Sequence, residues 1–129
     1  MPVTALAHYN LRADRETMEV LRDFYVKVVG LQPGFRPPFK SFGYWLYAGN
    51  QAVLHLSEAR ADELRTAGVV NTFDHVAFTC TGLATFEKHL RALAINFTSA
   101  QVPLTGERQI FFADPAGNGV ELNFSVTES

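Results

Sequence analysis

The stretch Phe112-Ala113-Asp114-Pro115-Ala116-Gly117-Asn118-Gly119-Val120-Glu121-Leu122 carries most of the information about the fold. Its centre, residues 114–119, combines Asp, Pro, Asn and two Gly, which are residues that favour tight turns. Glu121 follows in a strand-like run, between Val120 and Leu122. Because side chains alternate along a strand, Glu121 should face away from these two neighbours. The stretch therefore predicts a hairpin that commits one carboxylate to one face of a sheet.

The rest of the chain shows the same order of elements twice: a strand, a helix and three further strands. The two helices are predicted to begin at Asp14 and Thr81, which are 67 residues apart. The order predicts a single α+β domain, residues 1–129, built from two βαβββ modules that form a curved mixed sheet. The modules are expected at 1–57 and 72–129, with a polar, loosely helical connector at 58–71. The predicted strands are residues 3–11, 31–39, 42–47, 51–57, 72–79, 95–102, 107–113 and 120–126.

Composition excludes several classes of protein. With 129 residues, 47% of them hydrophobic, the chain can bury a core, and intrinsic disorder is excluded. A net charge of −2 without a basic stripe argues against nucleic acid as a partner. No apolar run is long enough to span a membrane, and no secretory signal is visible. The single cysteine, Cys80, cannot close an internal disulfide, so a cytoplasmic location is expected.

Three of the four histidines and one glutamate occupy equivalent places in the two halves. His8 and His75 lie 67 residues apart in the predicted first strands, and His55 and Glu121 lie 66 apart in the last strands. A twofold relation between the modules would bring all four to one point. Taken singly, each residue is more often structural or solvated. The functional hypothesis rests on equal spacing, equivalent elements and matching chemistry. His89, between charged neighbours in the second helix, is interpreted as a surface residue.

These four residues suit a divalent metal ion. A carboxylate committed to a sheet face is costly unless something pairs with it, and a metal ion would do so. Two imidazoles and a carboxylate with open positions are typical of non-haem Fe²⁺ sites, and Zn²⁺, Ni²⁺, Mn²⁺ or Co²⁺ also fits such a set. The sequence contains no nucleophile elbow and no glycine-rich phosphate loop.

Arg36 could reach a substrate anion, although an edge strand blunted by proline is the simpler interpretation. Tyr44 and Trp45 could line an apolar pocket, with core packing the more common role.

The sequence resembles the vicinal oxygen chelate superfamily, which includes glyoxalase I, bleomycin-resistance proteins and extradiol ring-cleaving dioxygenases. The resemblance covers nearly the whole chain and implies paired βαβββ modules around a metal ion, often in a homodimer. It is carried by the segments His8–Leu11, Phe24-Tyr25, Val29-Gly30-Leu31, Phe73–Phe78 and Phe112–Leu122.

The resemblance also implies roles for individual residues. His8, His75 and Glu121 match the family's metal ligands. His55 falls where glyoxalase-like members place a fourth ligand, usually a carboxylate, and where extradiol-like members place an acid/base histidine. A histidine at this position favours the dioxygenase branch, in which Fe²⁺ is the favoured ion. Phe111 stands where extradiol enzymes typically have a catalytic tyrosine, and a further family histidine is missing near residues 102–103.

Three functions therefore stay open from the sequence. The leading one is a metal-dependent enzyme whose substrate is a small molecule bound through two adjacent oxygens, in which His55 or Glu121 moves a proton. Its reaction would be extradiol-type ring cleavage or, alternatively, glyoxalase-like isomerase or lyase chemistry. The second is a non-catalytic protein that binds a small molecule of the antibiotic type, and the third is a domain that the metal only stabilises.

Overall fold

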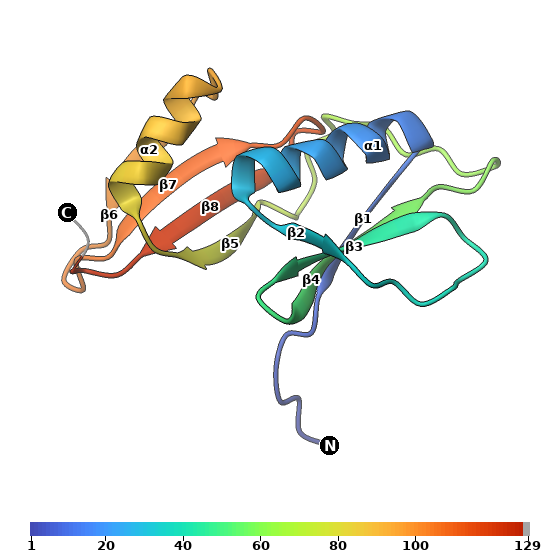
Figure 1. The fold of residues 1–129 in the computed structure, drawn as a ribbon, viewed down its shortest axis with the longest axis horizontal. Coiled ribbons are helices and arrows are strands. Elements are labelled where there is room, and N and C mark those ends of the chain that lie inside the picture. The colour runs from blue at the N-terminus through green and yellow to red at the C-terminus, as the bar shows by residue number, and fades with distance from the viewer. Residues whose placement is uncertain (128–129) are drawn as a thin grey trace. The chain divides into compact units, whose positions relative to one another are not determined.

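The computed structural model describes residues 1–127 and divides into two compact units, Met1–Ala67 and a second that begins at Gly68. Each unit contains one four-stranded mixed sheet and one long helix (Figure 1). The predicted α+β class and the repeated βαβββ order are confirmed. No helix within residues 1–127 is long and apolar enough to cross a membrane.

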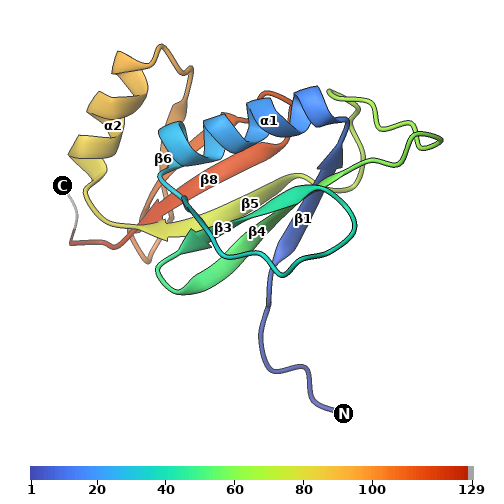
Figure 2. The ribbon, with the colours of Figure 1, turned by 45° about the vertical axis from the view of Figure 1, so that its right-hand side comes forward.

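The sheet of the first unit has the strand order β1-β4-β3-β2. β1 (Tyr9–Ala13) and β4 (Gln51–Glu58) pair in parallel, although they are the first and last strands of the unit. β3 (Gly43–Ala48) is antiparallel to β4, and Figure 2 shows β1, β4 and β3 side by side. The short β2 (Gln32–Gly34) forms the edge beside β3.

Helix α1 (Arg15–Phe24) begins where the sequence predicts. The side chain of Asp14 accepts a hydrogen bond of 2.8 Å from the backbone N–H of Thr17, which caps the first turn. The last turn widens into a π-helical segment, η1 (Tyr25–Val29), and the chain leaves it through Gly30 in the left-handed conformation with φ 94°.

The core of the first unit lies between this helix and one face of the sheet. Contacts join α1 to β1 and to β4. The largest fully buried side chains here come from both layers, namely Met18, Leu21 and Tyr25 from the helical segment and Leu46, Leu54 and Leu56 from the sheet. This face supplies the hydrophobic stabilisation of the unit, so polar side chains gather on the opposite face.

The second unit repeats this arrangement with the strand order β5-β8-β7-β6. β5 (His75–Cys80) pairs in parallel with β8 (Gly119–Phe124), which also pairs with the antiparallel β7 (Arg108–Ala113). β6 (Thr98–Gln101) completes the sheet beside β7.

Helix α2 (Leu83–Ala92) covers one face of the second sheet. Its Leu83 and Leu90 are buried, and the ring of Phe86 meets that of Phe124 edge-on at 5.8 Å. The predicted hairpin at residues 114–119 is confirmed as the connection between β7 and β8.

Two local predictions for helices are wrong. The cap of α2 is Gly82 in a left-handed conformation without a side-chain hydrogen bond, so Thr81 does not cap the helix. Beyond Glu58, which ends β4, the connector at 58–71 forms turns and no helix, and Glu63 accepts hydrogen bonds from the backbone N–H of Arg60 and the side chain of Arg65.

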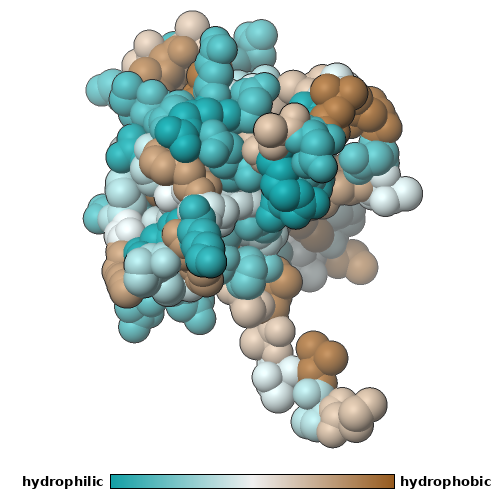
Figure 3. Space-filling model, turned by 90° about the vertical axis from the view of Figure 1, so that its right-hand side faces the viewer, coloured by the Kyte–Doolittle hydropathy of each residue, from teal (hydrophilic) through white to brown (hydrophobic). Residues whose placement is uncertain are grey.

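Several strand predictions need new boundaries. The strand predicted at 72–79 is His75–Cys80, and the strand predicted at 95–102 is Thr98–Gln101. Residues 1–8 form no regular structure, so His8 precedes β1 and does not lie within it. The exposed apolar residues Met1, Val3 and Leu6 belong to this segment, and Figure 3 shows brown atoms on the tail. Of the predicted strand 31–39, only Gln32–Gly34 forms, because Pro37 and Pro38 lack the N–H group that a ladder requires.

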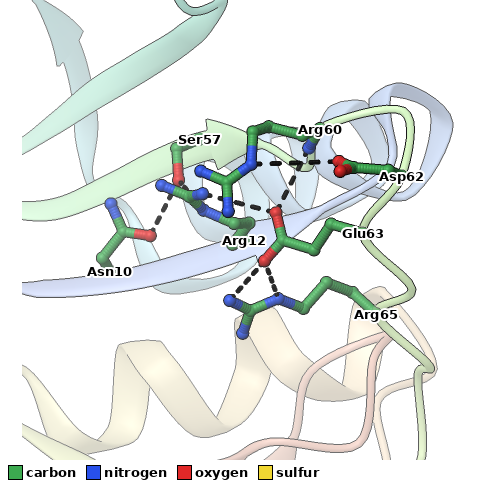
Figure 4. A network of polar contacts seen from close by, with 7 residues as sticks. All are labelled: Asn10, Arg12, Ser57, Arg60, Asp62, Glu63 and Arg65. Atoms are coloured by element: carbon green, nitrogen blue, oxygen red, sulfur yellow. Dashed lines mark hydrogen bonds and ion pairs between the residues drawn. The ribbon is translucent and has the colours of Figure 1, made fainter.

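Glu63 is the centre of a polar network at the end of β4 (Figure 4). Its carboxylate accepts hydrogen bonds from Arg65 at 2.7 Å, from the backbone N–H of Arg60 at 3.2 Å and from Arg12 at 3.4 Å. The hydrogen bond from Arg65 is the main reason that the pKa of Glu63 falls to about 2, and the N–H of Arg60 and the guanidinium of Arg12 also lower it. The network ties the connector to β1.

We expect Glu63→Gln to destabilise the protein at pH 7 and to lose this effect in acid. Because the folded pKa is depressed, the contribution of Glu63 is complete above the unfolded pKa of about 4.5 and disappears as the pH falls towards 2. Thermal unfolding of both proteins between pH 7 and pH 3 measures the difference. Asp62→Asn is the matched control, since the side chain of Asp62 is 90% exposed. A Tm difference that stays constant with pH would contradict the assignment.

Candidate functional site

One face of the first sheet carries three aromatic nitrogen heterocycles. In the ladder, Asn10 and Trp45 are the direct partners of His55 on either side, so their side chains share its face. His8 lies two residues before Asn10 and joins this group. We call this surface, made of His8, Asn10, Trp45 and His55, the histidine face.

The rings on the histidine face form a continuous stack. The centroids of His8 and His55 are 3.7 Å apart with 14° between the ring planes. The centroids of His55 and Trp45 are 4.0 Å apart with 10° between the planes. His55 is therefore the middle ring, held between two flat neighbours. This corrects the expectation that Trp45 packs in the core. Tyr44, next to it, does face the helix and donates a hydrogen bond of 2.8 Å to Glu19.

The stack keeps His55 neutral. Burial lowers the pKa of His55 most, and the nearby His8 and Arg36 lower it further, whereas a backbone hydrogen bond at Ala52 raises it. Since the ordinary histidine pKa is about 6.5, the imidazole is uncharged at pH 7. A neutral imidazole can bind a metal ion or accept a proton.

The second unit holds a buried carboxylate. Glu121 is 7% exposed, and its Oε1 lies 3.2 Å from Nε2 of His75. Its other oxygen, Oε2, accepts hydrogen bonds from the side-chain amides of Gln109 at 3.2 Å and Asn123 at 3.3 Å. We call His75, Gln109, Glu121 and Asn123 the Glu121 cluster. The alternation that placed Glu121 opposite Val120 and Leu122 is consistent with these contacts.

His75 has a carboxylate at each ring nitrogen. Its Nδ1 lies 2.8 Å from Oδ2 of the exposed Asp74. If Nδ1 carries the proton, its N–H donates a hydrogen bond to Asp74. Nε2 then presents a lone pair toward the side on which Glu121 lies. Asp74 is a positioning residue that the sequence analysis missed, and its place directly before His75 was the available signal.

The turn at residues 114–119 serves to place this cluster. The buried Asp114 accepts hydrogen bonds of 2.9 Å from the backbone N–H groups of Ala116 and Asn118, which fixes the turn. Gly119 pairs directly with His75, and a Cβ at Gly119 would lie 2.9 Å from that of His75 and would collide with the backbone of Asp74. Glycine at 119 is therefore required for the close approach of β5 and β8.

The structure thus places the four predicted site residues as two pairs. His8 and His55 belong to the first unit, and His75 and Glu121 belong to the second. Within residues 1–127, no three His, Cys, Asp or Glu residues gather closely enough to hold a metal ion. The pairing of the four residues in one site stays a prediction.

The Glu121 cluster nevertheless has the chemistry of a ligand set. Among the ion pairs of the described chain, Glu121 has no lysine or arginine partner, only His75. The amides that contact Oε2 are neutral donors and leave the negative charge uncompensated. Oε1 and Nε2 lie side by side, and oxygen and imidazole nitrogen are donors that first-row divalent ions accept. In their donor chemistry, Glu121 and His75 therefore suit a divalent metal ion as two of its ligands.

Phe111 confirms one departure from an extradiol site. It is the direct ladder partner of Glu121, and its ring meets that of His75 edge-on at 6.2 Å. An apolar ring therefore stands beside the cluster where the resemblance implied a phenol. Cys80 plays no part here, because burial raises the pKa of its thiol to about 11.

Comparison with known proteins agrees with this fold. The sequence model of the Glyoxalase/Bleomycin resistance protein/Dioxygenase superfamily matches residues 5–122. No curated protein matches the chain.

Solved structures give the same result. A protein assigned to the glyoxalase family from Bacillus anthracis has 20% identity and a TM-score of 0.72, with 97% of this chain and 98% of that chain covered. Lactoylglutathione lyase from Agrobacterium tumefaciens has 24% identity and a TM-score of 0.67, with 96% of each chain covered. A glyoxalase family protein from Enterococcus faecalis has 21% identity and a TM-score of 0.65, with 92% and 96% covered.

The stack makes Trp45 an optical reporter of His55. Trp45 is the only tryptophan, and an imidazolium quenches an indole in contact with it. We expect the fluorescence to fall as the pH drops from 8 to 5, with a midpoint below 6.5 because the pKa of His55 is lowered. His8→Ala removes a nearby positive charge and part of the cover, so the midpoint should rise. His89→Ala is the control. A midpoint at or above 6.5, or a transition that persists in His55→Ala, would argue against this geometry.

Proposed function

The chain belongs to the Glyoxalase/Bleomycin resistance protein/Dioxygenase superfamily, and on that premise we propose that it is a divalent-metal-dependent enzyme. Its substrate is a small molecule that binds through two adjacent oxygens. The observation that supports this most is the buried Glu121, whose charge no lysine or arginine of the described chain compensates and whose Oε1 lies beside Nε2 of His75. In this proposal His8, His75 and Glu121 hold the ion.

The ion would act as a Lewis acid on the substrate oxygens, and Fe²⁺ is the favoured choice. The chain's own residues supply the rest. Gln109 and Asn123 hold Oε2 of Glu121, so that Oε1 stays directed at the His75 side. His55 is neutral and clamped between two rings, so it can accept a substrate proton at a fixed position. The stack also places a ring against each face of the imidazole.

Extradiol-type ring cleavage is the leading reaction. The choice of this reaction rests on His55. Its imidazole can act as an acid or a base, and it occupies the position at which a glyoxalase-like enzyme would have a carboxylate ligand. Phe111 weighs against it, because no phenol is available beside Glu121. The second candidate is a glyoxalase-like isomerase or lyase, in which a carboxylate moves the proton. The support for that role is the place of Glu121, whose Oε1 lies 3.2 Å from Nε2 of His75 and is therefore next to the proposed metal ligand.

Metal analysis tests the proposed site. We expect protein purified without chelator to hold close to one divalent ion per site and to regain it after stripping. His75→Ala and Glu121→Ala should weaken metal affinity about tenfold or more, because each removes a ligand. His89→Ala, on the exposed side of α2, should bind like the wild type. Two results would rule the proposal out: metal binding that is unchanged in both ligand variants, or wild-type protein that binds no metal ion after reconstitution.

Two assays then separate the reactions. Fe²⁺-loaded protein in air with a catechol should produce the absorbance of a ring-opened product, and His55→Ala should abolish it. The alternative reaction should appear as lactoylglutathione formation by protein loaded with Ni²⁺ or Zn²⁺. Binding of small molecules that survives chelation, without either reaction, would favour a non-catalytic binding protein.

We also propose that the chain works as a homodimer, as the family resemblance implies. The expected mass in solution is then twice 14.3 kDa, measured by light scattering. A mixing experiment asks whether two copies share one site. His8→Ala/His55→Ala protein and His75→Ala/Glu121→Ala protein should each bind metal weakly. Recovery of metal binding in a refolded mixture would show a shared site. A monomeric mass at micromolar concentration would contradict the dimer.

A further inference from the structure

Arg36 is an arginine without a carboxylate partner. It lies in the loop between β2 and β3, and it makes no ion pair with any residue of the described chain. Within residues 1–127, six of the seven other arginines are paired with acidic side chains, namely Arg12, Arg15, Arg22, Arg60, Arg65 and Arg91, and Arg108 is the exception. Arg36 is also partly buried, and a partly buried charge without a counter-ion is costly.

The guanidinium is held in a fixed position. Nη1 donates a hydrogen bond of 2.9 Å to the backbone oxygen of Ser41, and Nη2 donates one of 3.2 Å to its hydroxyl. Cζ lies 4.9 Å from the centre of the Phe39 ring. Nε is buried and has no hydrogen-bond partner. The two bonds use one edge of the group, and the edge that includes Nε is left unsatisfied.

This guanidinium lies on the histidine face. A Cβ built at Gly43 would lie 3.0 Å from Nη2 and 3.2 Å from Cζ of Arg36, so the missing side chain of Gly43 makes the space that Arg36 occupies. Gly43 is two residues from Trp45 on the same strand and therefore points to the same side. The Phe39 ring under the guanidinium lies 6.1 Å from that of Trp45. The charge of Arg36 is also felt at His55.

We propose that Arg36 is a specificity-determining residue that binds a carboxylate of the substrate beside His55. The inference rests on the proposed function and narrows its substrate class to a planar molecule with two adjacent oxygens and a carboxylate. The carboxylate forms a charge-assisted pair with the Nη hydrogens of the guanidinium that Ser41 leaves free, since Nε itself is covered by the protein. Phe39 and Trp45 supply flat apolar surface for the ring that carries it.

Two probes that differ only by the carboxylate test this proposal. Catechol and 3,4-dihydroxybenzoate are titrated calorimetrically, without oxygen, into Zn²⁺-loaded and chelator-treated protein. We expect the wild type to bind 3,4-dihydroxybenzoate about tenfold or more tightly, and Arg36→Gln to remove this preference while leaving catechol affinity unchanged. Arg36→Lys keeps the charge and loses the planar guanidinium, so it should retain part of the preference. This variant also keeps the test decisive if Arg36→Gln does not fold.

Two controls separate recognition from a role in holding the loop. Arg15→Gln removes an exposed arginine that pairs with Glu58 on the helix-covered side of the sheet, and it should leave the preference intact. Ser41→Ala removes the hydroxyl that Nη2 contacts and keeps the charge, so the preference should persist. Equal affinity of the two probes in the wild type, a preference that survives Arg36→Gln, or no binding of 3,4-dihydroxybenzoate at millimolar concentration would overturn the proposal.

The titrations of chelator-treated protein distinguish the role of Arg36 from the proposed metal-dependent function. A carboxylate preference that depends on Arg36, together with affinities for both probes that are the same with and without Zn²⁺, would support Arg36 and count against chelation of the substrate. Binding of both probes that requires Zn²⁺, with no preference for the carboxylate, would support the metal site and overturn the role of Arg36.

Discussion

The parallel pairing of the first and last strands in each unit is the constraint on which the rest depends. β1 with β4, and β5 with β8, are neighbours in space although a helix and two strands separate them in the chain. A parallel pair cannot be closed by a tight turn and needs a long crossover. The helix of that crossover covers one face of its sheet. Apolar side chains therefore gather on that face, and the opposite face is left to polar groups.

This constraint explains the chemistry of both units. His55 can stack on His8 because β4 lies directly beside β1. Glu121 can approach His75 because β8 lies directly beside β5 and because Gly119 offers no side chain to hold the strands apart. In each unit one member of the pair lies on the last strand, and the other lies on the first strand (His75) or directly before it (His8). The same topology thus produces a ring stack in one unit and a carboxylate–imidazole pair in the other.

The sequence was sufficient to predict the order of elements, the hairpin before Glu121 and the face that Glu121 occupies, because these follow from local turn residues and alternation. It could not predict the neighbours across strands. Trp45 has the pattern of a core residue, and only the register of β3 with β4 puts it on His55. Gln109 reaches Glu121 from β7 for the same reason. The place of Arg36 depends on an irregular loop and on the small size of Gly43, which no periodic pattern encodes.

The strand pairing also makes the entropic cost of forming the sheet nearly equal in the two units. Asn10 pairs with His55 and Ala77 pairs with Glu121, so the loops that must close are 45 and 44 residues long. The entropy lost on closing a loop depends on the logarithm of its length, and both units therefore face nearly the same entropic barrier. Neither loop crosses the boundary between the units, so each sheet can form from its own segment of chain. A ribosome that has released the first half has already released everything that the first sheet requires.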